Sequence, residues 1–193
     1  MLLELLISLM FSLQSASGAT FEVDLWPGEG HPVFEAVAPQ LQLHELPSES
    51  SSVVETIRTR PGQRLAFDDT RYRTMRPGRF VVSASTRITG RRLGELSHLS
   101  RSDYYSGKFS PASLPVIGGD TIEYLQYRAE GTCFVRILNS VIDADPCPTE
   151  KEGEFRLEAK PTLEWWIHVM LDGTPRGWLL VTDATARVVD REG

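Results

Sequence analysis

The sequence lacks the short motifs that mark the common enzyme classes. It contains no Gly-x-Ser-x-Gly, no His-Glu-x-x-His, no P-loop and no dinucleotide-binding fingerprint. A nucleophilic triad could be drawn from Cys133, His168 and Asp172, but Cys133 lies inside an expected strand and has a candidate partner in Cys147. We therefore predict no catalytic residues and no cofactor, and we do not expect the protein to be an enzyme.

Cysteine is scarce, since the chain has only Cys133 and Cys147. In an exported protein an even pair at this spacing indicates a disulfide, which would stabilise the fold by about 3 kcal/mol. Two free buried thiols are the alternative. No metal site is predicted, because Cys-x-x-Cys is absent and the carboxylates of Asp143, Asp145 and Glu150 do not follow the spacing of a calcium loop.

Long apolar runs are absent after residue 19, so no membrane-spanning segment is expected in the rest of the chain. Residues 2–13 are almost wholly apolar and are followed by small residues, as in a secretory signal peptide. Glu4 and the lack of a preceding Lys or Arg depart from that pattern, and a buried N-terminal helix of a cytosolic protein is the alternative. We predict that residues 1–19 are a signal peptide and that the mature protein is periplasmic or secreted.

Positive charge is scarce in the second half of the chain. The formal net charge is −6; residues 20–108 hold 12 basic and 11 acidic residues, whereas residues 109–193 hold 8 basic and 14 acidic residues. Arginines cluster between Arg58 and Arg101, where they could bind an anionic polymer or face the acidic half of the same molecule. We favour the second interpretation, and the acidic pI makes nucleic acid a poor partner.

Helical periodicity is also scarce, and alternation of apolar and polar residues dominates, as in half-buried strands. Residues 41–46 and 121–127 show it, and residues 164–169 and 177–181 read as a hairpin around Asp172-Gly173-Thr174-Pro175. The segment 84–113 is rich in Ser, Arg and Gly, and is compatible with a short helix or irregular strands. The pattern predicts an all-β protein.

The chain resembles bacterial SH3-like (SH3b) domains of exported proteins. The residues that look like the opening of such a module are Leu43, Pro47, Ser48, Ser51, Ser52, Val53, Val54 and Gly62, and those that look like the close of another are Gly177 and Trp178. The resemblance implies one or two small SH3-like β-barrels. We accordingly expect an N-terminal SH3-like domain over 20–83, a connecting segment over 84–113 and a C-terminal SH3-like barrel over 114–193.

The resemblance further implies non-catalytic binding, with aromatic residues on one barrel face contacting the ligand. Trp178 matches a motif position. Aromatic side chains suited to ligand contact give four further candidates, namely Trp165, Trp166, Tyr124 and Tyr127. Trp165 and Trp166 are adjacent in a strand, so one should face inward and one outward. We favour the interpretation that both rings are packed, one inside the barrel and one against the other half of the chain, because tryptophan is highly buried on average.

We expect a binding or scaffolding module of the cell envelope that contacts cell-wall glycan or peptide, or a partner envelope protein. A second hypothesis is an envelope hydrolase, or a hydrolase inhibitor, with a site between the two halves. His168 in a cleft beside Asp172 or Glu164 would favour the hydrolase, whereas an exposed Trp166 or Tyr127 in an apolar patch would favour a protein partner.

Overall fold

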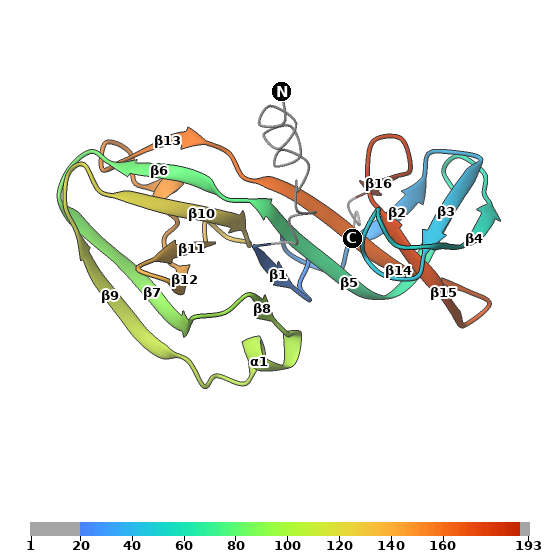
Figure 1. The fold of residues 1–193 in the computed structure, drawn as a ribbon, viewed down its shortest axis with the longest axis horizontal. Coiled ribbons are helices and arrows are strands. Elements are labelled where there is room, and N and C mark those ends of the chain that lie inside the picture. Colours follow the sequence, from blue (N-terminus) through green and yellow to red (C-terminus); the bar gives the residue numbers. More distant parts are fainter. Residues whose placement is uncertain (1–19, 190–193) are drawn as a thin grey trace, which may run out of the picture.

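The computed structural model describes residues 20–189, and almost every regular element in that range is a β-strand (Figure 1). The prediction of an all-β protein is confirmed. The predicted signal peptide, residues 1–19, lies outside the described residues. Between residues 20 and 189, no helix has the length and apolar character needed to cross a membrane.

The first sheet is built from the two ends of the described chain. Its hydrogen-bonded order is β16-β2-β5-β14-β15-β3-β4, with β1 paired to both β5 and β8. Its strands are β1 (Phe21–Val23), β2 (Val33–Ala36), β3 (Gln40–His44), β4 (Val53–Arg58), β5 (Arg64–Arg76), β8 (His98–Leu99), β14 (Thr162–Leu171), β15 (Thr174–Leu180) and β16 (Ala186–Val189).

The second sheet is built from the middle of the chain, in the order β13-β6-β10-β11-β12-β7-β9. Its strands are β6 (Gly78–Val82), β7 (Thr86–Gly94), β9 (Ser110–Val116), β10 (Thr121–Tyr127), β11 (Cys133–Ile137), β12 (Ser140–Ala144) and β13 (Phe155–Ala159). The helix α1 (Arg101–Tyr105) and the 3-10 turn η1 (Pro148–Glu150) complete the described elements.

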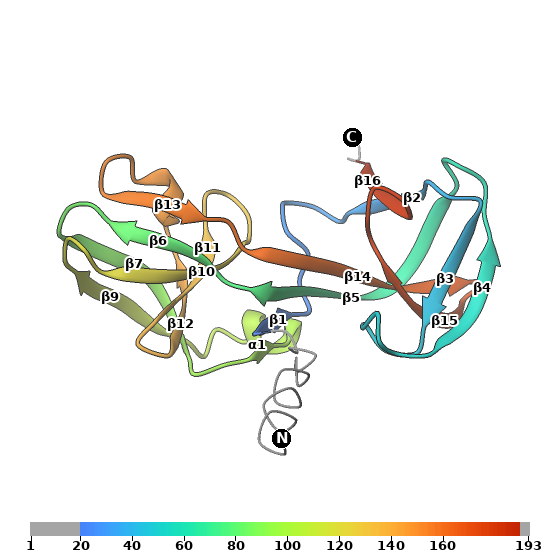
Figure 2. The same cartoon turned by 45° about the horizontal axis from the view of Figure 1, so that its top comes forward.

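The molecule has two lobes joined by a ribbon of two long strands (Figures 1 and 2). β5 and β14 run side by side between the lobes and pair antiparallel from Arg76 opposite Thr162 to Ala66 opposite Met170. One residue separates β5 from β6, and two residues separate β13 from β14. The chain therefore passes directly from one sheet into the other in two places, from β5 into β6 and from β13 into β14.

Three apolar clusters form the core. One lies in the first lobe around Phe34 and Ile167, and a second lies on one face of the second sheet around Phe80 and Ile142. The third covers the opposite face of the second sheet with β1, β8 and α1, and includes the fully buried Phe21. Because β10, β11 and β12 are covered on both faces, their sequences contain runs of buried residues rather than strict alternation.

The predicted division into halves does not match these sheets. The first sheet combines residues 21–76 and 162–189, with β8 added from the middle, and the second sheet consists of residues 78–159. The predicted connecting segment 84–113 instead contains β7, β8, α1 and the start of β9. Its glycines and arginines obscure the strand signal, although Ile88 and Leu93 point into the core. Among the described residues, neither of the two sheets closes into a barrel, because the first and last strands in each hydrogen-bonded order are not paired with each other.

The predicted hairpin is confirmed with a tighter turn. β14 ends at Leu171 and β15 begins at Thr174, so Asp172 and Gly173 are the two central residues. Their φ angles of 50° and 74° are both positive, as a type I′ turn requires.

The predicted disulfide between Cys133 and Cys147 is present, and both residues are completely buried. It joins β11 to the segment before η1 within the second sheet's core.

Candidate functional site

The two adjacent tryptophans of β14 face opposite sides of the first sheet, as expected for neighbours in a strand. Trp165 packs against Phe34 and Tyr72, with ring centroids 5.0 and 5.8 Å apart, and donates from Nε1 to the Thr70 hydroxyl. Trp166 is 0 % exposed. Both are therefore packing residues, and the Trp166 ring is closed to a ligand in this conformation.

Trp178 on β15 is half-buried beside a histidine. The His168 ring lies 4.9 Å from the Trp178 ring, and the Arg71 guanidinium lies 5.1 Å from that ring's centroid. His168 Nδ1 lies 2.9 Å from a carboxylate oxygen of Asp68. His168 thus pairs with Asp68 and forms no hydrogen bond or ion pair with Asp172, and Cys133 is held in the disulfide, so the geometry does not favour the nucleophilic triad.

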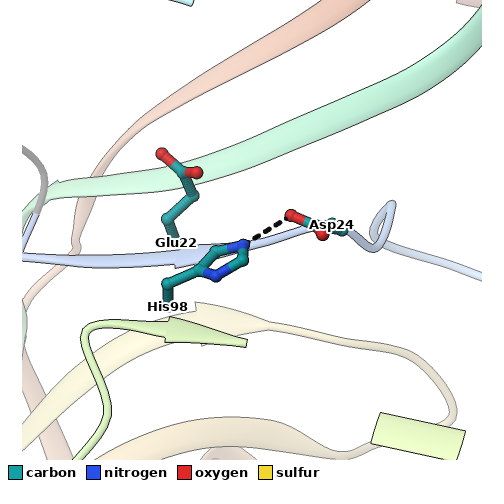
Figure 3. A group of neighbouring side chains, drawn as sticks. All are labelled: Glu22, Asp24 and His98. Carbon is teal, nitrogen blue, oxygen red and sulfur yellow. Dashed lines mark hydrogen bonds and ion pairs between the residues drawn. The ribbon is translucent and has the colours of Figure 1, made fainter. Parts of the chain in front are cut away.

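A charged cluster joins β1 and β8 to the long strand β5. Asp24 directly follows β1, and its Oδ1 lies 2.7 Å from His98 Nε2, whereas the Glu22 side chain extends from β1 to the side where β5 lies (Figure 3). Arg71 Nη1 lies 3.1 Å from the same Asp24 oxygen, and Arg73 Nε lies 3.1 Å from Glu22 Oε2. The cluster was not identified from the sequence, because its members are up to 76 residues apart.

This cluster has the residue types of a metal site, but its carboxylates already have cationic partners. One ligand atom each from Glu22, Asp24 and His98 lies within 4.8 Å of the others. The Arg71 guanidinium contacts both carboxylates and that of Arg73 contacts Glu22, so a bound cation would have to share them. We interpret the cluster as a salt-bridge network that holds β1 against β5.

Four of the eleven arginines between Arg58 and Arg101 form ion pairs within the described residues, so the interpretation that we favoured holds for only part of this segment. Three of its arginines pair with carboxylates from the second half of the chain, namely Arg73 with Glu164, Arg79 with Glu158 and Arg91 with Asp143. Arg71 differs, since its partners are Glu22, Asp24 and Asp69 of the first half.

A surface groove contains the other two predicted ligand residues, Tyr124 and Tyr127. It has a volume of about 320 Å³ and is lined by these rings together with Thr149, Leu157, Lys160, Pro161 and Leu163. Tyr127 is 40 % exposed and Leu157 37 % exposed, whereas Tyr124 is 9 % exposed and forms the floor. Burial, with a smaller contribution from the neighbouring Tyr127, raises the pKa of Tyr124, so its phenol is neutral at physiological pH.

The groove lies where the chain passes from the second sheet into the β5–β14 ribbon. Tyr124 and Tyr127 come from β10, Leu157 from β13, and Pro161 and Leu163 from the entry to β14. The structure thus brings Tyr124 and Tyr127 together and separates them from Trp165, Trp166 and Trp178, which belong to the first sheet. The contribution of β13 and Pro161 could not be identified from their own sequence pattern.

A buried aspartate anchors α1 to the second sheet. Asp143 is 5 % exposed, and its Oδ2 accepts from Arg91 Nη2 at 2.6 Å and from the Tyr104 hydroxyl at 3.1 Å. Its Oδ1 lies 3.4 Å from Arg128 Nε. Burial, with the Asp143 carboxylate as the second cause, raises the pKa of Tyr104 to about 12, so the phenol stays a donor. Asp143 therefore lies buried on β12, where it anchors α1, rather than in a solvated turn.

Comparison with known proteins identifies no relative: no family model, no curated protein and no solved structure matches the chain.

Proposed function

We propose that this protein is a non-catalytic binding module of the cell envelope, and that the groove of Tyr124 and Tyr127 is its ligand surface. The observation that carries the proposal is the exposure of aromatic and aliphatic side chains in one concave surface, which Tyr127, Leu157 and Pro161 border. Concave apolar surfaces with few polar groups are typical of binding sites.

The arrangement of the first sheet supports an SH3-like module. The residues that resemble the opening of such a module lie on β3, in the turn between β3 and β4, on β4 and in the turn after β4, and Gly177 and Trp178 lie on β15 of the same sheet. β16 pairs with β2, which brings the last strand beside an early one. The two parts of the resemblance thus belong to one open module, into which residues 78–159 are inserted.

The disulfide supports an envelope location, because disulfides persist in oxidising compartments such as the periplasm and the extracellular space. The ligand is cell-wall glycan or peptide, or an apolar segment of a partner envelope protein. Tyrosine rings suit both, since they stack on apolar faces and offer a hydroxyl for hydrogen bonding.

Binding to purified cell-wall sacculi and to solubilised envelope proteins tests the proposal. Wild type should be retained by one of the two, and Leu157→Ala and Tyr127→Ala should reduce retention about fivefold or more through the lost apolar contact. Leu138→Ala removes an equally large side chain that is 95 % exposed outside the groove, and it should bind as wild type does. Equal retention of all variants, or retention of none including wild type, would refute the proposal.

A further inference from the structure

A second concave site lies between the segment after β1, the helix α1 and the end of β10. It is a small cavity of about 160 Å³, and the side chains that define it are Leu25, Trp26, Arg101, Tyr104, Tyr105 and Arg128. None of these residues contributes to the groove of Tyr124 and Tyr127. Its size is below the 300 Å³ or so of a typical drug-sized site, so it would accommodate the end of a chain or a very small molecule.

The cavity carries an excess of positive charge. Within residues 20–189, no carboxylate oxygen lies within ion-pairing distance of Arg101. In the same range Arg128 pairs with Asp143 alone, and it shares that carboxylate with Arg91, whose Nη2 lies closer at 2.6 Å. Arg91 and Arg128 therefore share the Asp143 carboxylate, and Arg101 has no carboxylate partner among the described residues.

Both cavity arginines keep unused hydrogen-bond donors. Arg101 donates from Nε and Nη2 to the backbone carbonyl of Asp24, at 3.3 and 3.2 Å, which leaves Nη1 without an acceptor in the described part of the chain. Arg128 Nε is buried and faces Asp143 Oδ1 at 3.4 Å, and within the described residues the Nη1 and Nη2 atoms of Arg128 form no hydrogen bond. Guanidinium groups fixed in this way favour a planar anion such as a carboxylate.

Aromatic rings hold the two guanidinium groups and provide apolar walls. The Arg101 guanidinium lies 4.4 Å from the Trp26 ring centroid, and that of Arg128 lies 5.5 Å from the Tyr104 ring centroid. Tyr104 is 4 % exposed and is fixed by its bond to Asp143, whereas Tyr105 is 73 % exposed at the rim. Leu25 adds an aliphatic surface.

We propose that this cavity binds a carboxylate carried by a small apolar group, as at the C-terminal residue of a peptide. The carboxylate receives hydrogen bonds from Arg101 and Arg128, and the apolar group packs against Trp26 and Leu25. The site is separate from the proposed binding groove, and it does not depend on the function proposed for that groove.

Titration of the ¹⁵N-labelled full protein tests this proposal, with the indole N–H signal of Trp26 as the reporter. The probes are L-alanyl-L-alanine, D-alanyl-D-alanine, the C-terminal amide of each, and propionate. A free dipeptide should shift the Trp26 signal saturably at millimolar concentration, and its amide should bind at least tenfold more weakly. Binding of propionate as tight as that of the dipeptide would assign the site to small carboxylic acids rather than to peptide ends.

Matched arginine variants separate this site from general electrostatic attraction. Arg101→Gln should weaken binding of the free dipeptide about tenfold or more, because it removes a charged donor. Arg101→Lys should retain only part of the affinity, since it keeps the charge but loses the planar fork. Arg92→Gln makes the same charge change at an exposed position outside the cavity and should leave binding within about twofold. No shift with any probe, or equal binding of acid and amide, would overturn the proposal.

Discussion

Gly78 at the start of β6 lies directly against the backbone of Ala159 at the end of β13. A Cβ atom placed on Gly78 would stand 2.4 Å from the Ala159 carbonyl oxygen and 2.7 Å from the Pro161 nitrogen. This is the point where both chain segments pass from the second sheet into the β5–β14 ribbon. The absence of a side chain at Gly78 therefore allows the two segments to pass each other at the junction of the lobes.

Gly78→Ala should lower the free energy of unfolding by about 2 kcal/mol or more, because the contacting atoms are backbone and cannot move aside. Urea denaturation measures the change. Gly118→Ala is the matched control, since its Cβ would have its nearest neighbour at 3.5 Å, an ordinary contact. Equal stability of the two variants would show that the junction has room for a methyl group.

Glu164 should be a strong contributor to the stability of the first sheet. Its Oε2 accepts from Arg73 Nη1 at 3.2 Å and from Trp166 Nε1 at 2.9 Å. Glu164→Ala leaves the indole N–H of a buried ring and a largely buried guanidinium with fewer partners, which should cost about 2–3 kcal/mol. The comparison is Glu158→Ala, which should cost about 1 kcal/mol or less, because its arginine partners are exposed. Chemical denaturation of both variants tests the difference.

Removal of the disulfide should destabilise the protein by about 3 kcal/mol, as the loop-closure estimate for this spacing indicates. The variant is Cys133→Ala combined with Cys147→Ala, measured by thermal and urea unfolding. A reducing agent should lower the stability of wild type toward that of the double variant and leave the double variant unchanged. If reduction and substitution have no effect, the bond does not constrain the chain in solution.

Stability should fall between pH 10 and pH 12. Burial raises the pKa of Tyr72 and of Tyr104 from 10.0 to about 12. In this window the folded protein holds protons that the unfolded chain has released, so the free energy of unfolding decreases as pH rises. Below pH 10 both states are protonated at these groups and the contribution is fully present.

Tyr104→Phe should make the alkaline part of this dependence shallower, because it removes one of the three phenols whose pKa burial raises, the others being Tyr72 and Tyr124. It should also lower stability at neutral pH by about 1 kcal/mol, through loss of the hydrogen bond to Asp143. Tyr105→Phe changes an exposed ring on the same helix and is the control. Urea unfolding at several pH values measures the slope, and an unchanged slope for Tyr104→Phe would contradict the assignment.

Local patterns were sufficient for the features that depend on neighbouring residues. The hairpin at Asp172-Gly173 follows from turn chemistry, and the opposite faces of Trp165 and Trp166 follow from strand geometry. The disulfide follows from the presence of only two cysteines together with the expectation of export.

The arrangement of the strands could not be predicted in this way, because it depends on distant pairing. β5 and β14 are about 90 residues apart, and neither sequence specifies the other as its partner. The inserted second sheet, the cluster at Glu22, Asp24 and His98, and the anchor at Asp143 all depend on that pairing or on equally distant contacts. The length of β5, at 13 residues, is a signal that it extends beyond one lobe.

The central claim is that the groove of Tyr124 and Tyr127 contacts an envelope ligand. Site-specific photocrosslinking is the most direct test of it. A photoreactive amino acid at position 127 should crosslink to cell-wall material or to a defined envelope protein in cells that export the protein. The same group at position 138 is fully solvent-accessible outside the groove and should give only background. Crosslinking at position 127 no greater than at position 138 would contradict the account.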